Sequence, residues 1–285
     1  MAKGNLILGT AKNSVGDVVM YRREGAQITR VRVRNVKNPK TNAQSFQRAI
    51  MAPIAKFYSP LSVVLERSFE GLSKAKSHNK FNQVNANLAR KNKWALPKGT
   101  GFFPLPYQLS QGTIPSVNVK NDGGSLQYTI DIAHKGAAAT TIGQMSADFI
   151  AAGYKAGDVV TVIAVSGKEG SSNFFPLSMQ FEIDSASQVE ISTLTTNGVS
   201  ITSVENGGYE VKHVNDLLFA CAVIVSRFDG NMWRRSTQSL VVDLTKIPDV
   251  TTDAAVAAAI ASYGMTAGDG NPLVYLDGDE LADGQ

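Results

Sequence analysis

The chain has 285 residues, of which 43% are hydrophobic and 18% are charged, a composition typical of a folded globular protein and not of a disordered one. Its formal net charge of +4 conceals an asymmetry. Residues 1–100 contain 19 Lys and Arg against 4 Asp and Glu, whereas residues 101–285 contain 9 against 20. We therefore expect two regions with different roles, and a basic region that faces an anionic partner.

The sequence shows no pattern typical of a membrane span, a signal peptide or a disulfide. No apolar run has the length of a transmembrane helix, and the apolar stretch near residue 6 is too short for a signal peptide. We expect a cytoplasmic protein without a membrane partner, or a component of a particle assembled in the cytoplasm. The single cysteine, Cys221, excludes an internal disulfide, and its apolar neighbours predict a buried strand position.

The first predicted element is a β-hairpin in the stretch GDVVMYRREGAQITRVRVRNV. Its strands are expected at residues 18–22 and 27–35, with a turn at 23–25. Strand periodicity separates the second strand into an arginine face and a valine face. The arginine face contains Ile28, Arg30, Arg32 and Arg34, and the other face contains Thr29, Val31 and Val33.

Helices are predicted after the turn at Asn38 and Pro39. Thr41 and Gln44 have the spacing of a capping box, and Pro53 predicts a kink or break in the helix that follows. The apolar stripe of this helix consists of Phe46, Ile50, Ile54 and Phe57. We expect Val31 and Val33 to share a core with the first three of these residues, with the arginines pointing away from it.

Two further helical segments are expected before residue 100. The first is predicted over residues 61–69 and the second over about 80–94. The second would direct Phe81, Val84, Leu88 and Trp94 inward. The stretch KGTGFFPLPYQLSQGT, residues 98–113, is interpreted as a linker or a packed crossing and as the domain boundary.

The remaining sequence predicts strands and then an acidic tail. Seven short apolar stretches separated by turn residues at 114–245 favour an immunoglobulin-like antiparallel β-sandwich, with one helical insert near 146–153. After Pro248, an Ala-rich helix capped by Thr252 or Asp253 is expected, followed by an acidic end. The predicted fold class is α+β, with a basic assembly domain at 1–100, the sandwich at 101–247 and the tail at 248–285.

No pattern in the chain predicts catalysis, a metal or a cofactor. Gly4 and Gly9 have phosphate-loop spacing, but the Lys and Ser or Thr that should follow are missing. The three histidines are far apart in sequence, and the acidic tail departs from the order of a calcium loop. There is no G-x-S-x-G nucleophile elbow. We therefore expect a protein that is not an enzyme.

The basic residues around the second strand are the candidate functional site. This site consists of Arg22, Arg23, Arg30, Arg32, Arg34, Lys37 and Lys40. One interpretation is a ribbon that neutralises DNA phosphates, and a second is an edge strand kept soluble by its charge. In a third interpretation the site meets the acidic half of a neighbouring copy.

Several stretches resemble a domain-of-unknown-function family whose members occur in Bacteroidota and in the crAss-like and other phages that infect them. The similarity lies in the opening MAKG, in GDVVMY, in NPKTNAQ from Asn38 to Gln44, and in YSPL at 58–61. GYKAGDVV and VIVSRFDGNMWRRSTQSLVV are similar to the second half of that family, so the resemblance covers most of residues 1–245. It implies no enzyme activity, and in phages it suggests a virion component.

Together these observations predict a non-enzymatic phage structural protein of the neck, tail or capsid, in the virion. It would self-assemble through charge-complementary surfaces, with copies of itself and other virion proteins as partners. One alternative is a sequence-nonspecific DNA-binding protein that uses the basic strand. Another is a host-surface or carbohydrate-binding module, for which the candidate aromatic residues are Phe174, Phe175 and Trp233.

Overall fold

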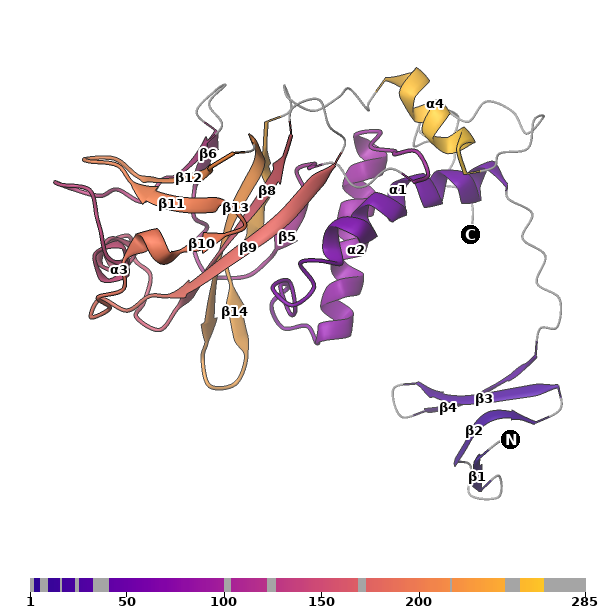
Figure 1. Cartoon of the computed structure of the whole chain (residues 1–285). Helices are drawn as coiled ribbons and strands as arrows, with labels where there is room; N and C mark the ends of the chain where they lie inside the picture. Colours follow the sequence, from indigo (N-terminus) through magenta and orange to yellow (C-terminus); the bar gives the residue numbers. More distant parts are fainter. Residues whose placement is uncertain are drawn as a thin grey trace. The chain divides into compact units, whose positions relative to one another are not determined.

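The computed structural model is mixed α+β, with mostly antiparallel sheets and four α-helices in its described part (Figure 1). It describes residues 3–5, 10–15, 17–23, 26–32, 41–99, 104–121, 127–168, 173–215, 217–243 and 252–263. The chain divides into two compact units, Met1–Pro39 and Lys40–Gln285. This division replaces the boundary that we expected near residue 100.

The first unit is a four-stranded antiparallel sheet in the order β1-β2-β3-β4. Its strands are β1 (Lys3–Asn5), β2 (Thr10–Val15), β3 (Val18–Arg23) and β4 (Ala26–Val31). Strands β3 and β4 pair along their whole length, from Val18 opposite Val31 to Arg23 opposite Ala26. The predicted hairpin is therefore confirmed over the described residues, and it belongs to a larger meander.

A helical layer opens the second unit, formed by α1 (Asn42–Tyr58) and α2 (Lys74–Lys91). The Thr41 side chain accepts a hydrogen bond from the Gln44 amide at 3.4 Å, which confirms the predicted cap. The reciprocal half of a capping box is missing, because Gln44 Oε1 is buried without a hydrogen-bond partner.

Helix α1 continues through Pro53 without the predicted break. Proline at this position cannot donate the helical hydrogen bond to the carbonyl of Ala49. That carbonyl instead accepts from the Leu96 amide at 3.2 Å, from the segment that follows α2. A tertiary contact thus satisfies the group that the proline leaves open.

The helix predicted over residues 61–69 is wrong, since this segment is a series of turns. Arg67 has a positive φ of 54°, a backbone conformation outside the right-handed helix. The second predicted helix is confirmed as α2, although it begins six residues earlier than expected. Phe81 and Trp94 are buried, and Val84 and Leu88 pack partly buried against the same core.

Two sheets follow the helices. The strands of the first, in the order β10-β11-β12-β7-β6, are Thr195–Thr196, Val199–Ser203, Tyr209–His213, Gln127–Ile130 and Val119–Asn121. The strands of the second, in the order β14-β13-β8-β9, are Trp233–Arg235, Leu217–Phe228, Val159–Gly167 and Phe174–Glu182. The second sheet also contains β16 (Val241–Val242), which pairs with β13.

Shorter elements complete the second unit. β5 (Gln108–Ser110) pairs with β15 (Gln238–Ser239), and the short helix η1 covers Ile191–Thr193. Helix α3 (Ile142–Ala151) confirms the predicted helical insert, and its cap is a complete capping box between Thr141 and Gln144.

The sheet that contains β8 and β13 lies between two buried clusters. On β8, Val160, Val162 and Ala164 belong to the cluster shared with the other sheet. Ile163 and Val165 belong to the cluster shared with helices α1 and α2. The second unit therefore has three layers, a sheet, a central sheet and helices (Figure 1). An apolar strand buried on both faces explains the nearly continuous hydrophobic run of β8.

Strand β13 also contributes side chains to both buried clusters, but a bulge interrupts its pairing with β8. The register against β8 shifts between Leu218 and Ala220, so Phe219 is an extra residue. Leu218 faces the sheet–sheet cluster, and Cys221 faces the same cluster although an even alternation would place it opposite. Because of the extra residue, odd-numbered residues after the bulge face the cluster that even-numbered Leu218 faces before it. Burial of Cys221, which raises its thiol pKa to about 12, confirms the predicted core position.

The helical cluster extends beyond the predicted domain limits. Leu105, Tyr107 and Leu109 of the proposed linker are buried in it together with residues of α1 and α2. So are Val256 and Ile260 of α4 (Asp253–Ala261), whose predicted cap Thr252 is confirmed. The crossing at 104–110 and the helix after residue 252 are therefore parts of one folded unit.

Candidate interaction surface

The described side chains of the N-terminal sheet lie almost entirely on β3 and β4 and form no buried core. Of its residues whose side chains are described, none is buried, and the most enclosed are only half-buried. Tyr21 is 37% exposed and Val31 is 74% exposed. Three or more strands need an apolar face that packs against something to be stable by themselves. The described side chains of β3 and β4 are therefore accessible to a partner on both faces.

Pairing assigns the side chains of the sheet to two faces. Val19 lies opposite Arg30, and Tyr21 lies opposite Ile28, so these four residues share one face. The Arg30 guanidinium lies 5.8 Å from the centroid of the Tyr21 ring, a cation–π geometry. The other face contains Val18, Met20, Thr29 and Val31.

The predicted site residues are placed only in part. Arg22, Arg30 and Arg32 are exposed. Arg23 ends strand β3, and its side chain lies outside the description. Arg34, Lys37 and Lys40 lie outside the described residues. The structure thus brings Arg30 and Arg32 to one edge strand and its end, and it leaves the rest of the predicted set unplaced.

The predicted core under the hairpin is wrong for Val31, because this residue is exposed. Val33 lies outside the described residues. The helix stripe of Phe46, Ile50 and Ile54 instead packs with residues of α2, the 105–109 segment and β13. The alternating valines of the strand and the apolar stripe of α1 each need apolar partners. Periodicity in the sequence does not show which residues those partners are.

Strand β4 is an edge of its sheet. The Arg32 amide donates to the carbonyl of Asp17 at 2.6 Å, so the residues of β4 with even numbers bond inward to β3. In an antiparallel pair the intervening residues direct their peptide groups to the opposite side. The peptide groups of Thr29 and Val31 therefore point toward the open edge.

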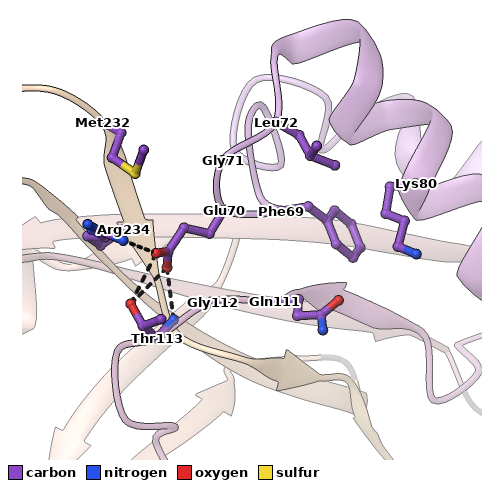
Figure 2. A pocket seen from close by; sticks show the side chains of 10 residues that line it. All are labelled: Phe69, Glu70, Gly71, Leu72, Lys80, Gln111, Gly112, Thr113, Met232 and Arg234. Carbon is purple, nitrogen blue, oxygen red and sulfur yellow. Dashed lines mark hydrogen bonds and ion pairs between the residues drawn. The ribbon is translucent and has the colours of Figure 1, made fainter.

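A pocket of about 680 Å³ lies in the second unit, between the loop at 69–72, the crossing at 111–113 and the hairpin that ends in β14 (Figure 2). Its polar centre is Glu70, whose side chain is only 12% exposed. Glu70 accepts from Arg234 Nη1 at 2.5 Å and from the Thr113 amide at 2.8 Å. The Thr113 hydroxyl donates to the same carboxylate at about 3 Å.

The electrostatics of Glu70 favour the ionised form. Burial raises the pKa of its carboxyl, but hydrogen bonds from Arg234 and Thr113 outweigh burial and lower the pKa below the usual value. Gly112 allows this close packing, since a Cβ there would lie 2.2 Å from the carbonyl oxygen of Arg235. The carboxylate thus ties three chain segments together, a role that does not require proton exchange.

A second polar cluster joins strand β12 to helix α3. Asp148 accepts from the Tyr209 hydroxyl at 2.5 Å, and His134 Nδ1 lies 2.7 Å from the same carboxylate oxygen. His134 Nε2 contacts the Ala137 carbonyl. Because both ring nitrogens face acceptors, the hydrogen bonds to Ala137 and Asp148 raise the pKa of His134 against the opposing effect of burial.

The aromatic residues of the carbohydrate-binding alternative lie in different environments. Phe174 is buried and meets Phe219 edge-on, with ring centroids 5.0 Å apart. Phe175 is 57% exposed on the edge strand β9. Trp233 is half-buried and lies 5.4 Å from the ring of Phe228.

Neither a metal-binding cluster nor a membrane-spanning helix is present among the described residues. Among these residues no group of three or more His, Cys, Asp or Glu side chains is placed to hold a metal ion. Of the helices in the described ranges, none is both long and apolar enough to cross a membrane.

Comparison with known proteins identifies one region. Residues 9–109, just over a third of the chain, match a family of unknown function, DUF6266. The predicted resemblance to an uncharacterised family is confirmed for this region, which includes the hairpin, α1, α2 and the start of β5. No curated protein matches the chain. No solved structure matches it either.

Proposed function

We propose that the protein is a non-enzymatic structural component of a phage particle that self-associates through its N-terminal sheet. The observation that supports this proposal most is the absence of any buried side chain among the described residues of that sheet. Strands β3 and β4, whose described side chains are exposed or half-buried on both faces, with an open edge at β4, are suited to an interface that forms on assembly.

Charge supports contact between copies. Residues 1–39 contain eight Lys and Arg and two acids, whereas residues 101–285 contain more than twice as many acids as bases. Opposite charges on different parts of the same chain favour head-to-tail contacts, which can close into rings. The virion setting, a neck, tail or capsid position and an immunoglobulin-like description of the facing sheets rest on the resemblance and remain proposals.

Self-association can be measured by sedimentation velocity on the full chain across a range of salt concentrations. We expect oligomers at low salt whose dissociation constant rises with ionic strength, because exposed charge pairs are screened over about 10 Å at 0.1 M salt. A chain that stays monomeric at low salt and high concentration would contradict the proposal.

DNA binding is the second candidate, favoured by the exposure of Arg30 and Arg32. Duplex DNA of unrelated sequences should then bind equally well, and the logarithm of affinity should fall linearly with the logarithm of salt concentration. Replacing both arginines with serine should reduce that slope by about two if each contacts one phosphate. An unchanged slope would assign the arginines to protein contacts.

A further inference from the structure

A strand that pairs with the open edge of β4 should have a particular pattern of charged and apolar side chains. Thr29 and Val31 direct their peptide groups outward, and an added strand would pair with them. The same strand would place side chains beside Arg30 and Arg32 on one face and beside Thr29 and Val31 on the other. A suitable partner is therefore acidic at alternate positions and apolar at the positions between them.

A second copy of β4 does not satisfy this requirement. In an antiparallel pair of β4 strands, arginines of the two copies would lie on the same face near one another. Like charges across strands are destabilising, and charged edge strands are a common means of preventing such pairing. The arginines of β4 therefore disfavour pairing between the β4 strands of two copies.

The C-terminal region of this chain supplies acids at the required alternate spacing. Residues 268–285 contain five acids and no Lys or Arg. Within PLVYLDGDE, alternate positions carry Tyr275, Asp277 and Asp279. The intervening positions carry Val274, Leu276, Gly278 and Glu280. Asp277 and Asp279 can lie opposite Arg30 and Arg32 in either strand direction, in one order or the other. Gly278 then lies opposite Val31, and Leu276 lies on the valine face diagonally across from it.

We propose that residues 273–280 of one copy add as a strand to the open edge of β4 in a neighbouring copy. This inference rests on the proposed self-association and names the contact that produces it. One strand position then satisfies the outward peptide groups and pairs Arg30 and Arg32 with acids. It also brings Leu276 diagonally across from Val31, which is 74% exposed. Repetition of the contact joins copies head to tail.

A charge exchange tests the contact in the full-length protein. We would compare R30D/R32D with D277R/D279R. Each variant alone has like charges at both partners and should self-associate at least about tenfold more weakly than the wild type at low salt. In an equimolar mixture both contacts between unlike variants are again between opposite charges, so association should return with the two variants alternating. Recovery on mixing excludes misfolding as the cause of the loss.

A matched control changes acids of the same region outside the strand. D269R/D283R alters the net charge as much as D277R/D279R does, and should leave the dissociation constant within about twofold if position matters more than total charge. An equal loss in both tail variants, or no recovery in the mixture, would overturn the strand assignment.

Cysteine pairs test the assignment of faces. Cys221 is buried, so new thiols can be oxidised with little background. Gly278→Cys should cross-link between copies with Val31→Cys, which lies opposite it, and not with Arg30→Cys, which lies on the opposite face. Cross-linking only to position 30 would contradict the proposal.

The outcomes separate the two levels of inference. If the wild type self-associates and D277R/D279R associates equally well, the strand contact is wrong while the proposed function stands. If the wild type is monomeric under all conditions, both fail.

Discussion

At the residue scale, a two-pronged ionic contact joins Asp158 to Arg227. Asp158 is fully buried, and it accepts from Arg227 Nε at 2.6 Å and from Nη2 at 2.7 Å. The Arg227 side chain retains 27% of its exposure. Removal of one partner from such a pair leaves a charge with little water around it. Nothing in the local sequence distinguishes this aspartate from those on the surface, so the pair could not be predicted.

We expect Arg227→Met to destabilise the protein by about 3 kcal/mol, at the lower end of the range for a broken buried pair because the arginine is partly exposed. Asp131→Asn is the control, since Asp131 and Lys120 form an exposed pair at 2.8 Å. Its cost should be below about 1 kcal/mol. Urea denaturation at neutral pH measures both values, and equal costs would contradict the distinction.

His134 supplies a prediction about pH. The hydrogen bonds that it makes to Ala137 and Asp148 raise its pKa in the folded protein above the ordinary value of 6.5. A raised folded pKa contributes stability that is fully present below pH 6.5 and is lost as the pH rises through the folded pKa. The melting temperature should therefore fall over this range, and His134→Gln should flatten that part of the profile. A profile unchanged by the substitution would contradict this assignment.

At the element scale, sequence patterns predicted the helices and strands better than they predicted which elements pack together. The hairpin, α2, α3 and the cap of α4 were recognisable because turn residues, apolar stripes and capping residues are local signals. A kink or a break was expected at Pro53, and α1 continues through this residue, whereas the helix expected at 61–69 was wrong. In the first case a distant amide from Leu96 satisfies the backbone, and in the second Arg67 adopts a left-handed conformation that no neighbouring residue indicates.

The crossing at 111–113 offers a test at this scale. A Cβ at Gly112 would lie 2.2 Å from the Arg235 carbonyl oxygen and 2.6 Å from Glu70 Oε2. Gly112→Ala should therefore separate the segments that Glu70 joins and cost about 1–3 kcal/mol. Val63→Ala, at a site that is 83% exposed, should cost under about 0.5 kcal/mol. Chemical denaturation distinguishes the two, and a neutral Gly112→Ala would show that the crossing can move.

At the scale of the whole molecule, the central sheet couples the layers of the second unit. Both buried clusters include residues of β8 and β13, whereas no described residue of 1–39 belongs to either cluster. A domain boundary was expected near residue 100, and in the structure the aromatic segment at 104–110 packs into the helical core. Composition marked this segment as unusual without indicating its contacts.

We expect residues 40–285 to unfold in one calorimetric transition, because neither outer layer keeps its core once the central sheet is lost. A chain without residues 1–39 should melt within about 2 °C of the full chain at concentrations where both are monomeric. Two separate transitions in the second unit, or a large fall in melting temperature on truncation, would contradict this view.

The bulge at Phe219 also has a consequence for how the gene can change. Loss or gain of one codon within β13 would move its flanking side chains from one core to the other, so both cores would be disrupted together. Substitutions that preserve volume can accumulate along this strand, but changes of length cannot. Homologous chains should therefore vary in length at their turns and keep the same spacing between Leu218 and Cys221.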